Sequence, residues 1–263
     1  MRYWRQALWA VILILADLQV ISAQPSAAAD GQGRRSGFAD MGATTQAMQR
    51  DDRQNPAMLW VAEGDALWRR NTGSADKSCA SCHGQVSSLQ GVAAQYPRFD
   101  NQSQKPVNLG ERINLCRQRH QLAPTLSHQD ERLIALEALV AHQSRGMSIR
   151  PDTDPRLQAF RQRGEALFSQ RFGQLDLSCA QCHDQQAGRL LGGTVIPQAH
   201  PTGYPLYRLE WQGMGTLQRR LRNCMSGVRA APFAFGSEEL LGLELYLAQR
   251  AAGMPLETPA VRP

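Results

Sequence analysis

Two short runs of the sequence each place two cysteines three positions apart, with a histidine directly after the second. These residues are Cys79, Cys82 and His83 in the first run, and Cys179, Cys182 and His183 in the second. In such a C-x-x-C-H unit both thiols bond to haem as thioethers, and the histidine supplies one axial ligand of the iron. The sequence therefore predicts two covalently bound c-type haems.

Each iron then needs a ligand on the opposite side of its haem. The two units mark an internal repeat, so the second ligand should recur at matching positions. Methionine fails this test, because Met214 and Met225 have no counterpart between Cys82 and the terminal helix of the first half. Histidine also fails, since none of these residues recurs in the other half: His120, His128 and His200.

The two remaining cysteines do recur, at Cys116 and Cys224. Each follows an arginine by four residues, Arg112 or Arg220, and precedes a proline by eight. We favour thiolate ligation of both irons, which would lower both reduction potentials. Two alternatives remain open at this point, a single disulfide joining the two cysteines and a pair of buried, unreactive thiols.

The helix before each haem unit has the same pattern in both halves. Asn55-Pro56 and Asp154-Pro155 each predict a helix cap followed by proline at the first helical position. The apolar positions match at an offset of 100, with Trp60, Gly64, Leu67 and Trp68 corresponding to Phe160, Gly164, Leu167 and Phe168. This spacing puts them on one helical face, where the glycine allows another helix to approach closely.

A second helix closes each half. Residues 135–147 match residues 242–254 at an offset of 107, and we expect Ser127 and Ser237 to cap these helices. Helix, C-x-x-C-H unit, irregular loop and terminal helix follow one another in an order that resembles the class I cytochrome c fold. We therefore expect an all-α tandem duplication with long irregular loops, with a first domain at 55–151 and a second at 152–263.

Residues 1–23 have the build of a secretory signal peptide. Arg2 and Arg5 precede a ten-residue apolar run, Ala7 to Ala16, and Ala23 offers a small residue for cleavage. Ten residues are too few to span a bilayer, which takes roughly 20. We therefore expect export to the periplasm and no membrane span after removal of the signal. Residues 24–54, rich in small and polar residues, predict a lightly structured N-terminal arm.

The formal net charge of the whole chain is +6. In an exported protein this does not indicate nucleic-acid binding. It favours instead an affinity for small anionic substrates or acidic partner surfaces. Arginines surround both Cys116 and Cys224, so their density alone does not distinguish the two sites; each could also bind solvent or a haem propionate.

With two haem units and two recurrent cysteines, the chain resembles the SoxA family, the dihaem subunits of the SoxAX cytochromes of bacterial thiosulfate oxidation. The segment 220–236 (RLRNCMSGVRAAPFAFG) resembles that family's active-site signature. The likeness covers nearly all of the mature chain. It implies an L-cysteine S-thiosulfotransferase that joins thiosulfate to a cysteine of the carrier protein SoxYZ, in a heterodimer with the monohaem cytochrome SoxX.

The resemblance also implies roles for single residues. The second haem would be the active one, with Cys224 present as a persulfide and Arg220 steering the anionic substrate. The first haem, with Cys116, would lie too far away for a clear catalytic role. The rival hypotheses are a dihaem electron-transfer cytochrome without its own substrate and a dihaem peroxidase, whose expected methionine and histidine ligands are missing from the matching positions.

Overall fold

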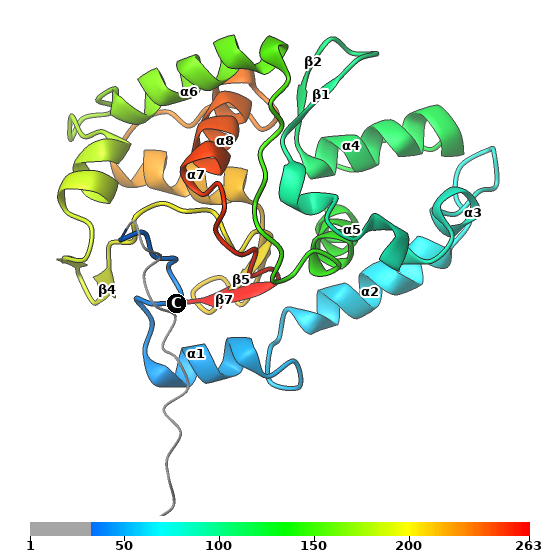
Figure 1. Cartoon of the computed structure of the whole chain (residues 1–263), viewed down its shortest axis with the longest axis horizontal. Coiled ribbons are helices and arrows are strands. Elements are labelled where there is room, and N and C mark those ends of the chain that lie inside the picture. Colours follow the sequence, from blue (N-terminus) through cyan, green and yellow to red (C-terminus); the bar gives the residue numbers. More distant parts are fainter. Residues whose placement is uncertain (1–32) are drawn as a thin grey trace, which may run out of the picture.

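The structure, a computed structural model, describes residues 33–263; the predicted signal peptide at 1–23 lies outside them. Its two halves lie side by side (Figure 1). The first half contains α2 (Met58–Arg69), α3 (Ala80–His83), α4 (Leu109–Cys116) and α5 (Glu131–His142). The second half contains α6 (Gln158–Ser169), α7 (Leu217–Gly227) and α8 (Glu238–Arg250). Short 3-10 or π turns connect them: η1 (Val86–Leu89), η2 (Ala93–Gln95), η3 (Arg117–Gln121), η4 (Pro155–Leu157) and η5 (Gln181–Gln185).

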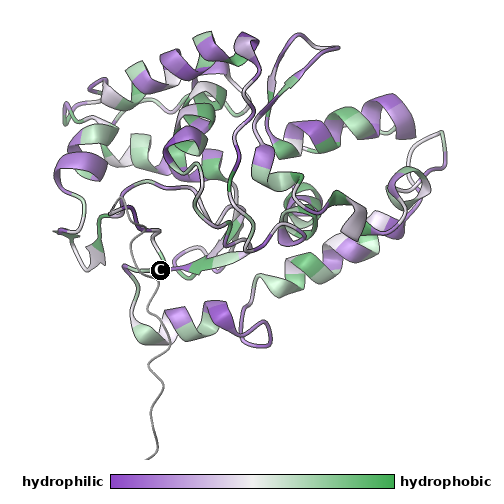
Figure 2. Ribbon diagram, in the orientation of Figure 1, coloured by the Kyte–Doolittle hydropathy of each residue, from purple (hydrophilic) through white to green (hydrophobic). Residues whose placement is uncertain are grey.

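A crossed pair of helices forms the core of each half, α2 with α5 and α6 with α8. The glycines predicted to allow close approach lie at these crossings. A Cβ atom on Gly64 would collide with the carbonyl oxygen of Ala135, and one on Gly164 would collide with that of Gly242. The prediction of close helix contact at both glycines is confirmed. Figure 2 shows apolar residues on the inner sides of the helices and hydrophilic ones on the outer turns of α4 and α6.

Two of the predicted helix caps are present. Asp154 caps η4, directly before α6, by accepting a hydrogen bond from the N–H of Arg156, and Ser237 caps α8. Asn55 accepts a hydrogen bond from the N–H of Ala57, but the prediction that it caps the helix is wrong, because α2 begins only at Met58 with Ala57 as its N-cap. The prediction of Ser127 as the cap of α5 is wrong, because Asp130 takes that place. Ser127 lies one turn earlier, where its carbonyl accepts a hydrogen bond from the N–H of Asp130 at 2.9 Å.

The prediction of an all-α fold is wrong in the loops, which contain short strands. These are β1 (Arg98–Asp100), β2 (Lys105–Val107), β3 (Leu190–Leu191), β4 (Thr194–Val195), β5 (Leu206–Arg208), β6 (Gly213–Gly215) and β7 (Ala260–Arg262). β1 pairs with β2 and β5 with β6, both antiparallel, while β7 adds to β5 in parallel. Segments of two or three residues are too short to give a recognisable alternation of apolar and polar residues.

The N-terminal arm is more ordered than its composition suggests. In its described part, α1 (Ala43–Arg50) follows two buried side chains, Phe38 and Met41. The side chain of Gln49 accepts a hydrogen bond from the N–H of Val261 in β7 at 3.0 Å. Residues 33–54 therefore pack on the C-terminal strand of the second half, and the expectation of light structure is wrong for this part of the arm.

Backbone hydrogen bonds join the ends of the two halves in a reciprocal pattern. The N–H of Gly146 donates to the carbonyl of Leu256 at 2.7 Å, and its equivalent Gly253 donates to Ile149 at 2.8 Å. Each member of this pair corresponds to a member of the other at an offset of 107, so an approximate twofold axis relates the halves. Within residues 33–263, every helix is too short or too polar to cross a bilayer.

Candidate functional site

The first haem unit lies on the one-turn helix α3. Cys79 is its N-cap residue, and Cys82 and His83 lie on the helix itself. The His83 ring packs 5.7 Å from the ring of Trp68 on α2, and the side-chain amide of Gln121 lies 3.8 Å from the Cys79 sulfur. Helix α2 and the turn after α4 therefore enclose the unit from two sides.

The second unit is centred on η5, which carries Cys182 and His183. The Nδ1 atom of His183 lies 2.7 Å from the carbonyl oxygen of Pro197. A metal-binding histidine typically donates its second ring N–H to a carbonyl in this way, which fixes the ring and leaves Nε2 for the metal. The Pro197 carbonyl therefore fixes the His183 ring and leaves Nε2 available to a metal.

The recurrent cysteines lie near the attachment cysteines of their own half. Cys116 is the last residue of α4 and interacts electrostatically with Cys79 and Cys82. Cys224 lies on α7 and interacts with Cys179. All six cysteines are free, so the alternative of a disulfide between Cys116 and Cys224 is not formed.

Burial shifts the pKa of three of the six thiols. It raises the pKa of Cys79 and of Cys116, and it raises that of Cys179 to about 11. Around Cys116 the positive charges of Arg112 and Arg119 oppose this effect. Without a bound metal, the partly buried thiols of Cys79, Cys116 and Cys179 therefore stay protonated at neutral pH, whereas a cysteine that held iron would do so as the thiolate.

A pocket beside the first unit has the composition that a haem needs. Its lining residues are Leu67, Arg70, Thr72, Cys79, Arg117, Gln121, Leu126, Arg132 and Leu136. The leucines suit the flat apolar macrocycle, and the arginines suit its two propionates. Together with the thiols and the histidine, this pocket fits a covalently held haem.

In the first half, a buried carboxylate neutralises the arginines next to the candidate ligand. Asp100 of β1 accepts bonds from Arg112 at 2.8 Å and from Arg119 at 2.8 and 3.1 Å. Its side chain is only 4% exposed, and the Arg119 guanidinium holds the pKa of this carboxyl well below its usual range. Arg112 and Arg119 therefore already have their anion.

In the second half, the arginine equivalent to Arg112 has no such partner. Two neighbouring arginines are engaged, since Arg219 stacks on Trp211 at 4.1 Å and Arg222 on Phe235 at 4.4 Å. The Arg220 guanidinium makes neither an ion pair nor a side-chain hydrogen bond within residues 33–263. Arg220 is therefore a cation near Cys224 that can bind an anion.

Position 208 explains the missing partner. At an offset of 108, Asp100 at the end of β1 corresponds to Arg208 at the end of β5. Among residues 33–263, the Arg208 guanidinium forms an ion pair only with Glu210, at 2.9 Å, and that carboxylate is 62% exposed. The residue at this position is thus negative in the first half, beside Arg112, and positive in the second half, where Arg220 is the equivalent arginine.

Each cysteine site has its own tyrosine nearby, Tyr96 in the first half and Tyr204 in the second. In the first half, Tyr96 accepts a hydrogen bond from Arg112, and its pKa is raised by burial. At an offset of 108, burial also raises the pKa of Tyr204, against the opposing charge of Arg220; the tyrosine interacts with Cys224 as well. Each half therefore places a partly buried phenol close to its arginine and its cysteine.

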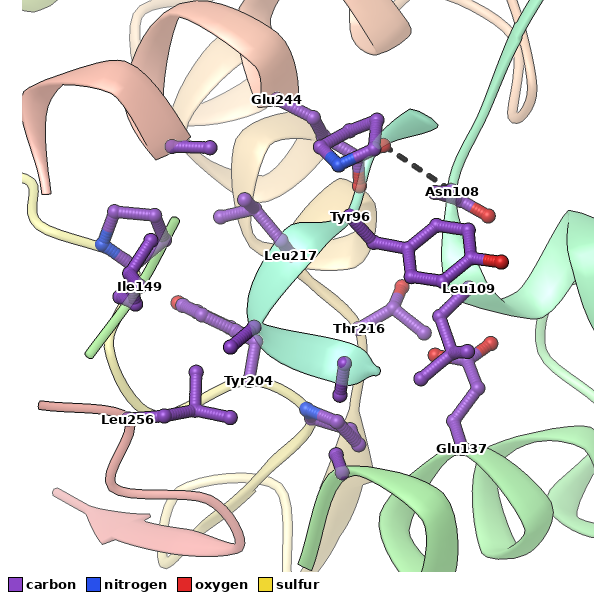
Figure 3. Close-up of a pocket in the computed structure, with 17 residues that line it drawn as sticks. Tyr96, Asn108, Leu109, Glu137, Ile149, Tyr204, Thr216, Leu217, Glu244 and Leu256 are labelled. Atoms are coloured by element: carbon purple, nitrogen blue, oxygen red, sulfur yellow. Dashed lines mark hydrogen bonds between the residues drawn. The ribbon is translucent and has the colours of Figure 1, made fainter. Parts of the chain in front are cut away.

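Both tyrosines also line a cavity between the halves (Figure 3). Most of its walls are equivalent pairs: Tyr96 and Tyr204, Asn108 and Thr216, Leu109 and Leu217, Glu137 and Glu244, Ala141 and Ala248, Ile149 and Leu256. The cavity therefore lies on the approximate twofold axis. It is lined by none of the six cysteines, so it is distinct from the two haem units.

Two glutamates face each other across this cavity. Burial raises the pKa of both Glu137 and Glu244 to about 8, and the charge of Glu244 adds to the shift of Glu137. Glu244 accepts hydrogen bonds from Asn108 at 3.1 Å and Gln218 at 3.2 Å (Figure 3 shows the first). Glu137 makes none within the described residues. At neutral pH both carboxyls are therefore mainly protonated.

The profile of the family described as "SoxA/TsdA, cytochrome c domain" matches residues 63–149 and 163–256, one match in each half. The L-cysteine S-thiosulfotransferase subunit SoxA of Rhodovulum sulfidophilum is 35% identical over 255 residues, covering 95% of this chain and 89% of that protein. SoxA of Pseudaminobacter salicylatoxidans is 38% identical over 230 residues, covering 86% and 80%.

The chain belongs to the SoxA family. Among solved structures, SoxXA from P. pantotrophus matches with a TM-score of 0.84 and 33% identity, over 88% of this chain and 87% of that one. The duplication of a cytochrome c domain predicted from the sequence is thereby confirmed. Membership in the SoxA family also means that the chain carries covalently bound haem c.

Sequence analysis found the cysteines, the histidines and Arg220 but missed Asp100, Arg208 and the two tyrosines. The internal repeat of the sequence contains a signal for these four residues. The dipeptide Tyr-Pro occurs at 96–97 and again at 204–205, and counting four residues from each tyrosine gives Asp100 and Arg208. Aligning the halves beyond the haem units would have shown the charge inversion.

Proposed function

We propose that this chain is the catalytic dihaem subunit of an L-cysteine S-thiosulfotransferase, with its active site at Cys224 in the second half. Two relatives of at least 35% identity have that activity in their names. The observation that carries the assignment of the site is Arg220, an unpaired guanidinium one helical turn before Cys224 on α7. A dianion such as thiosulfate needs a fixed cation of this kind.

The proposed reaction forms one sulfur–sulfur bond. The thiol of the carrier cysteine loses its proton to water, its sulfur bonds to the outer sulfur of thiosulfate, and two electrons leave. Bound haem supplies the electron acceptor. Arg220 binds the sulfonate oxygens and orients the outer sulfur toward Cys224. If the outer sulfur first bonds to Cys224 with loss of the two electrons, the carrier thiolate then attacks that sulfur and the Cys224 thiolate leaves. We further propose that Cys224 is held as a persulfide.

The haem ligands follow from the same proposal. Cys79 and Cys82 attach the first haem and Cys179 and Cys182 the second. The axial pairs are His83 with Cys116 and His183 with Cys224. Support comes from the Pro197 carbonyl that orients His183 and from the closeness of Cys116 to Cys79. The proposed domain limits are 55–151 and 152–263, with the arm at 24–54.

The proposed partners are a SoxX monohaem cytochrome and the carrier protein SoxYZ, in the periplasm. The matching solved structure is a SoxXA complex, and a fold match at this level supports the same heterodimer here. The net charge of +6 favours the association of this chain with anions such as thiosulfate.

The experiment that tests the function uses the mature holoprotein with SoxX, reduced SoxYZ, thiosulfate and an electron acceptor. Mass spectrometry of the carrier should show one thiosulfate added at its cysteine, with two electrons passed per carrier. A holoprotein that is reduced and reoxidised normally but leaves the carrier unmodified would contradict the proposal and favour the electron-transfer cytochrome.

A further inference from the structure

Equivalent hairpins end at opposite charges in the two halves. In β1–β2, Asp100 pairs in register with Lys105, and in β5–β6, Arg208 pairs with Gly213. Both pairs correspond at an offset of 108. The backbone therefore presents the same position to both cysteine sites, with a carboxylate in one half and a guanidinium in the other.

The first half shows what this position touches. The Asp100 carboxylate contacts Arg112 at 2.8 Å, and its charge reaches Cys116. The residue at the end of the hairpin thus lies next to the arginine that precedes the cysteine by four residues. The same geometry in the second half places Arg208 near Arg220, whose charge acts on it. Both arginines and Cys224 also interact with Tyr204.

Arg208 itself is held in place and incompletely satisfied. Its side chain is 12% exposed and its guanidinium lies 5.3 Å from the ring centre of Trp211. Its Nε atom is buried and has no hydrogen-bond partner in the described part of the chain. Burial, and then the charge of Arg220, lower the pKa of Arg208. An anion between two such cations would relieve both the repulsion and the unsatisfied donor.

The backbone at position 208 is also held by one more strand than the backbone at position 100. In the second half β7 adds to β5 in parallel, and Arg208 pairs in register with Arg262. In the first half β1 pairs only with β2. A third strand fixes the backbone from which Arg208 extends, which is what a binding group needs to meet its ligand without reorganisation.

We propose that Arg208 is a specificity-determining residue that binds the sulfonate end of thiosulfate together with Arg220. This proposal rests on the proposed function of the Cys224 site. Two guanidinium groups match the two negative charges of the substrate, and the outer sulfur then faces the cysteine. The first half cannot bind the dianion in this way, because Asp100 occupies the equivalent place.

The test compares Arg208→Gln and Arg208→Lys in the complete holoprotein with SoxX and SoxYZ. The matched control is Arg163→Gln on α6, an exposed arginine that pairs with Glu239 at 2.6 Å. We expect Arg208→Gln to raise the KM for thiosulfate about tenfold or more, with little change in kcat. Lysine should restore part of the affinity, since it keeps the charge but loses the planar fork.

The dependence on salt provides a second readout that a structural role would not change. The rise of KM with ionic strength should be shallower in Arg208→Gln than in the wild type and unchanged in Arg163→Gln. An unchanged KM in Arg208→Gln would overturn the proposal. So would an altered haem reduction potential at an unchanged KM, because Arg208 would then serve a haem propionate.

Failure of this inference is distinguishable from failure of the proposed function. If the wild type does not modify the carrier, the function itself is wrong. If the wild type is active and Arg208→Gln matches it, only the role of Arg208 is wrong. Should Arg208→Gln not fold, Arg208→Lys decides: a KM about threefold higher or more supports the role, and a wild-type KM overturns it.

Discussion

The surroundings of Cys116 and Cys224 share a scaffold but differ in charge. Each cysteine follows an arginine by one helical turn and interacts with a partly buried tyrosine. Asp100 closes the first site with a buried counter-charge, whereas Arg208 leaves the second without one. A single inverted charge thus separates a self-neutralised site from one that can bind an anion, on a duplicated backbone.

The comparison teaches that arginine density is a poor guide to anion binding. Arginines lie around both cysteines in sequence, yet Arg112 and Arg119 near Cys116 are paired with Asp100. What matters is whether a buried carboxylate already satisfies them, since a paired guanidinium has little affinity left for a substrate. In the part of the chain that the structure describes, the only carboxylate paired with Arg208 is Glu210, which is 62% exposed.

Replacing the two cysteines in turn would break the comparison most severely. Cys224→Ala should abolish thiosulfate coupling, while Cys116→Ala should retain most of the turnover. Carrier modification by mass spectrometry measures both, and the mass of each variant should still show two attached haems. Equal losses in the two variants would show that the halves do not differ in catalysis.

Removing the buried counter-charge tests the structural half of the comparison. Asp100→Asn should lower the free energy of unfolding by about 3 kcal/mol, because Arg112 and Arg119 would be left without their anion. Glu210→Gln is the matched control and should cost less than about 0.5 kcal/mol, since that ion pair is exposed. Denaturant unfolding of the holoproteins measures both values.

The same carboxyl makes a pH prediction. Its pKa is lowered in the folded state, so its contribution is fully present above pH 4 and is lost only as pH falls through the lowered value. The stability difference between wild type and Asp100→Asn should therefore be constant from about pH 5 upward and shrink in acid. A difference that grows in acid would contradict the pairing.

The equivalent arginines should differ in what their loss affects. Arg220→Gln should lower kcat/KM for thiosulfate about 10- to 100-fold, the effect of one lost charge-assisted contact, with partial rescue in Arg220→Lys. Arg112→Gln should lower stability but leave kcat/KM near the wild-type value. Steady-state kinetics across thiosulfate concentrations would separate the two, and a comparable kinetic effect of Arg112→Gln would contradict the assignment.

The smallest expected effect concerns the two glutamates on the twofold axis. Both carboxyls have a pKa near 8 in the folded state and about 4.5 when unfolded. Folding therefore takes up protons between these values, and stability should fall as pH rises from 4.5 to 8. Glu137→Gln should remove part of this loss, stabilising the protein by about 1–2 kcal/mol at pH 8 and hardly at pH 5.

Glu244→Gln should increase the stability at pH 8 by less than Glu137→Gln does, because the Glu244 carboxylate already accepts hydrogen bonds from Asn108 and Gln218. Thermal unfolding of both variants across this pH range is the measurement. A larger increase in stability for Glu244→Gln would contradict the account, because it would show that Glu137, which accepts no hydrogen bond within the described residues, is not the more destabilising of the two carboxyls.

The sequence predicts the covalent chemistry and the duplication because both depend on local, repeated patterns. The haem units, the crossing glycines Gly64 and Gly164, and the recurrence of Cys116 and Cys224 are visible in the order of residues. The short strands are not, because segments of two or three residues give no recognisable alternation of apolar and polar residues. The inversion between Asp100 and Arg208 matters only once the hairpins bring those positions beside the arginines on α4 and α7.

The central claim is that thiosulfate binds at the Cys224 site and not at the Cys116 site. Electron paramagnetic resonance of the oxidised holoprotein should show two low-spin ferric signals of the thiolate type, assigned by their change in Cys116→Ala and Cys224→Ala. Adding thiosulfate without the carrier should shift only the signal assigned to Cys224. A shift confined to the Cys116 signal, or no shift of either at saturating thiosulfate, would contradict the account.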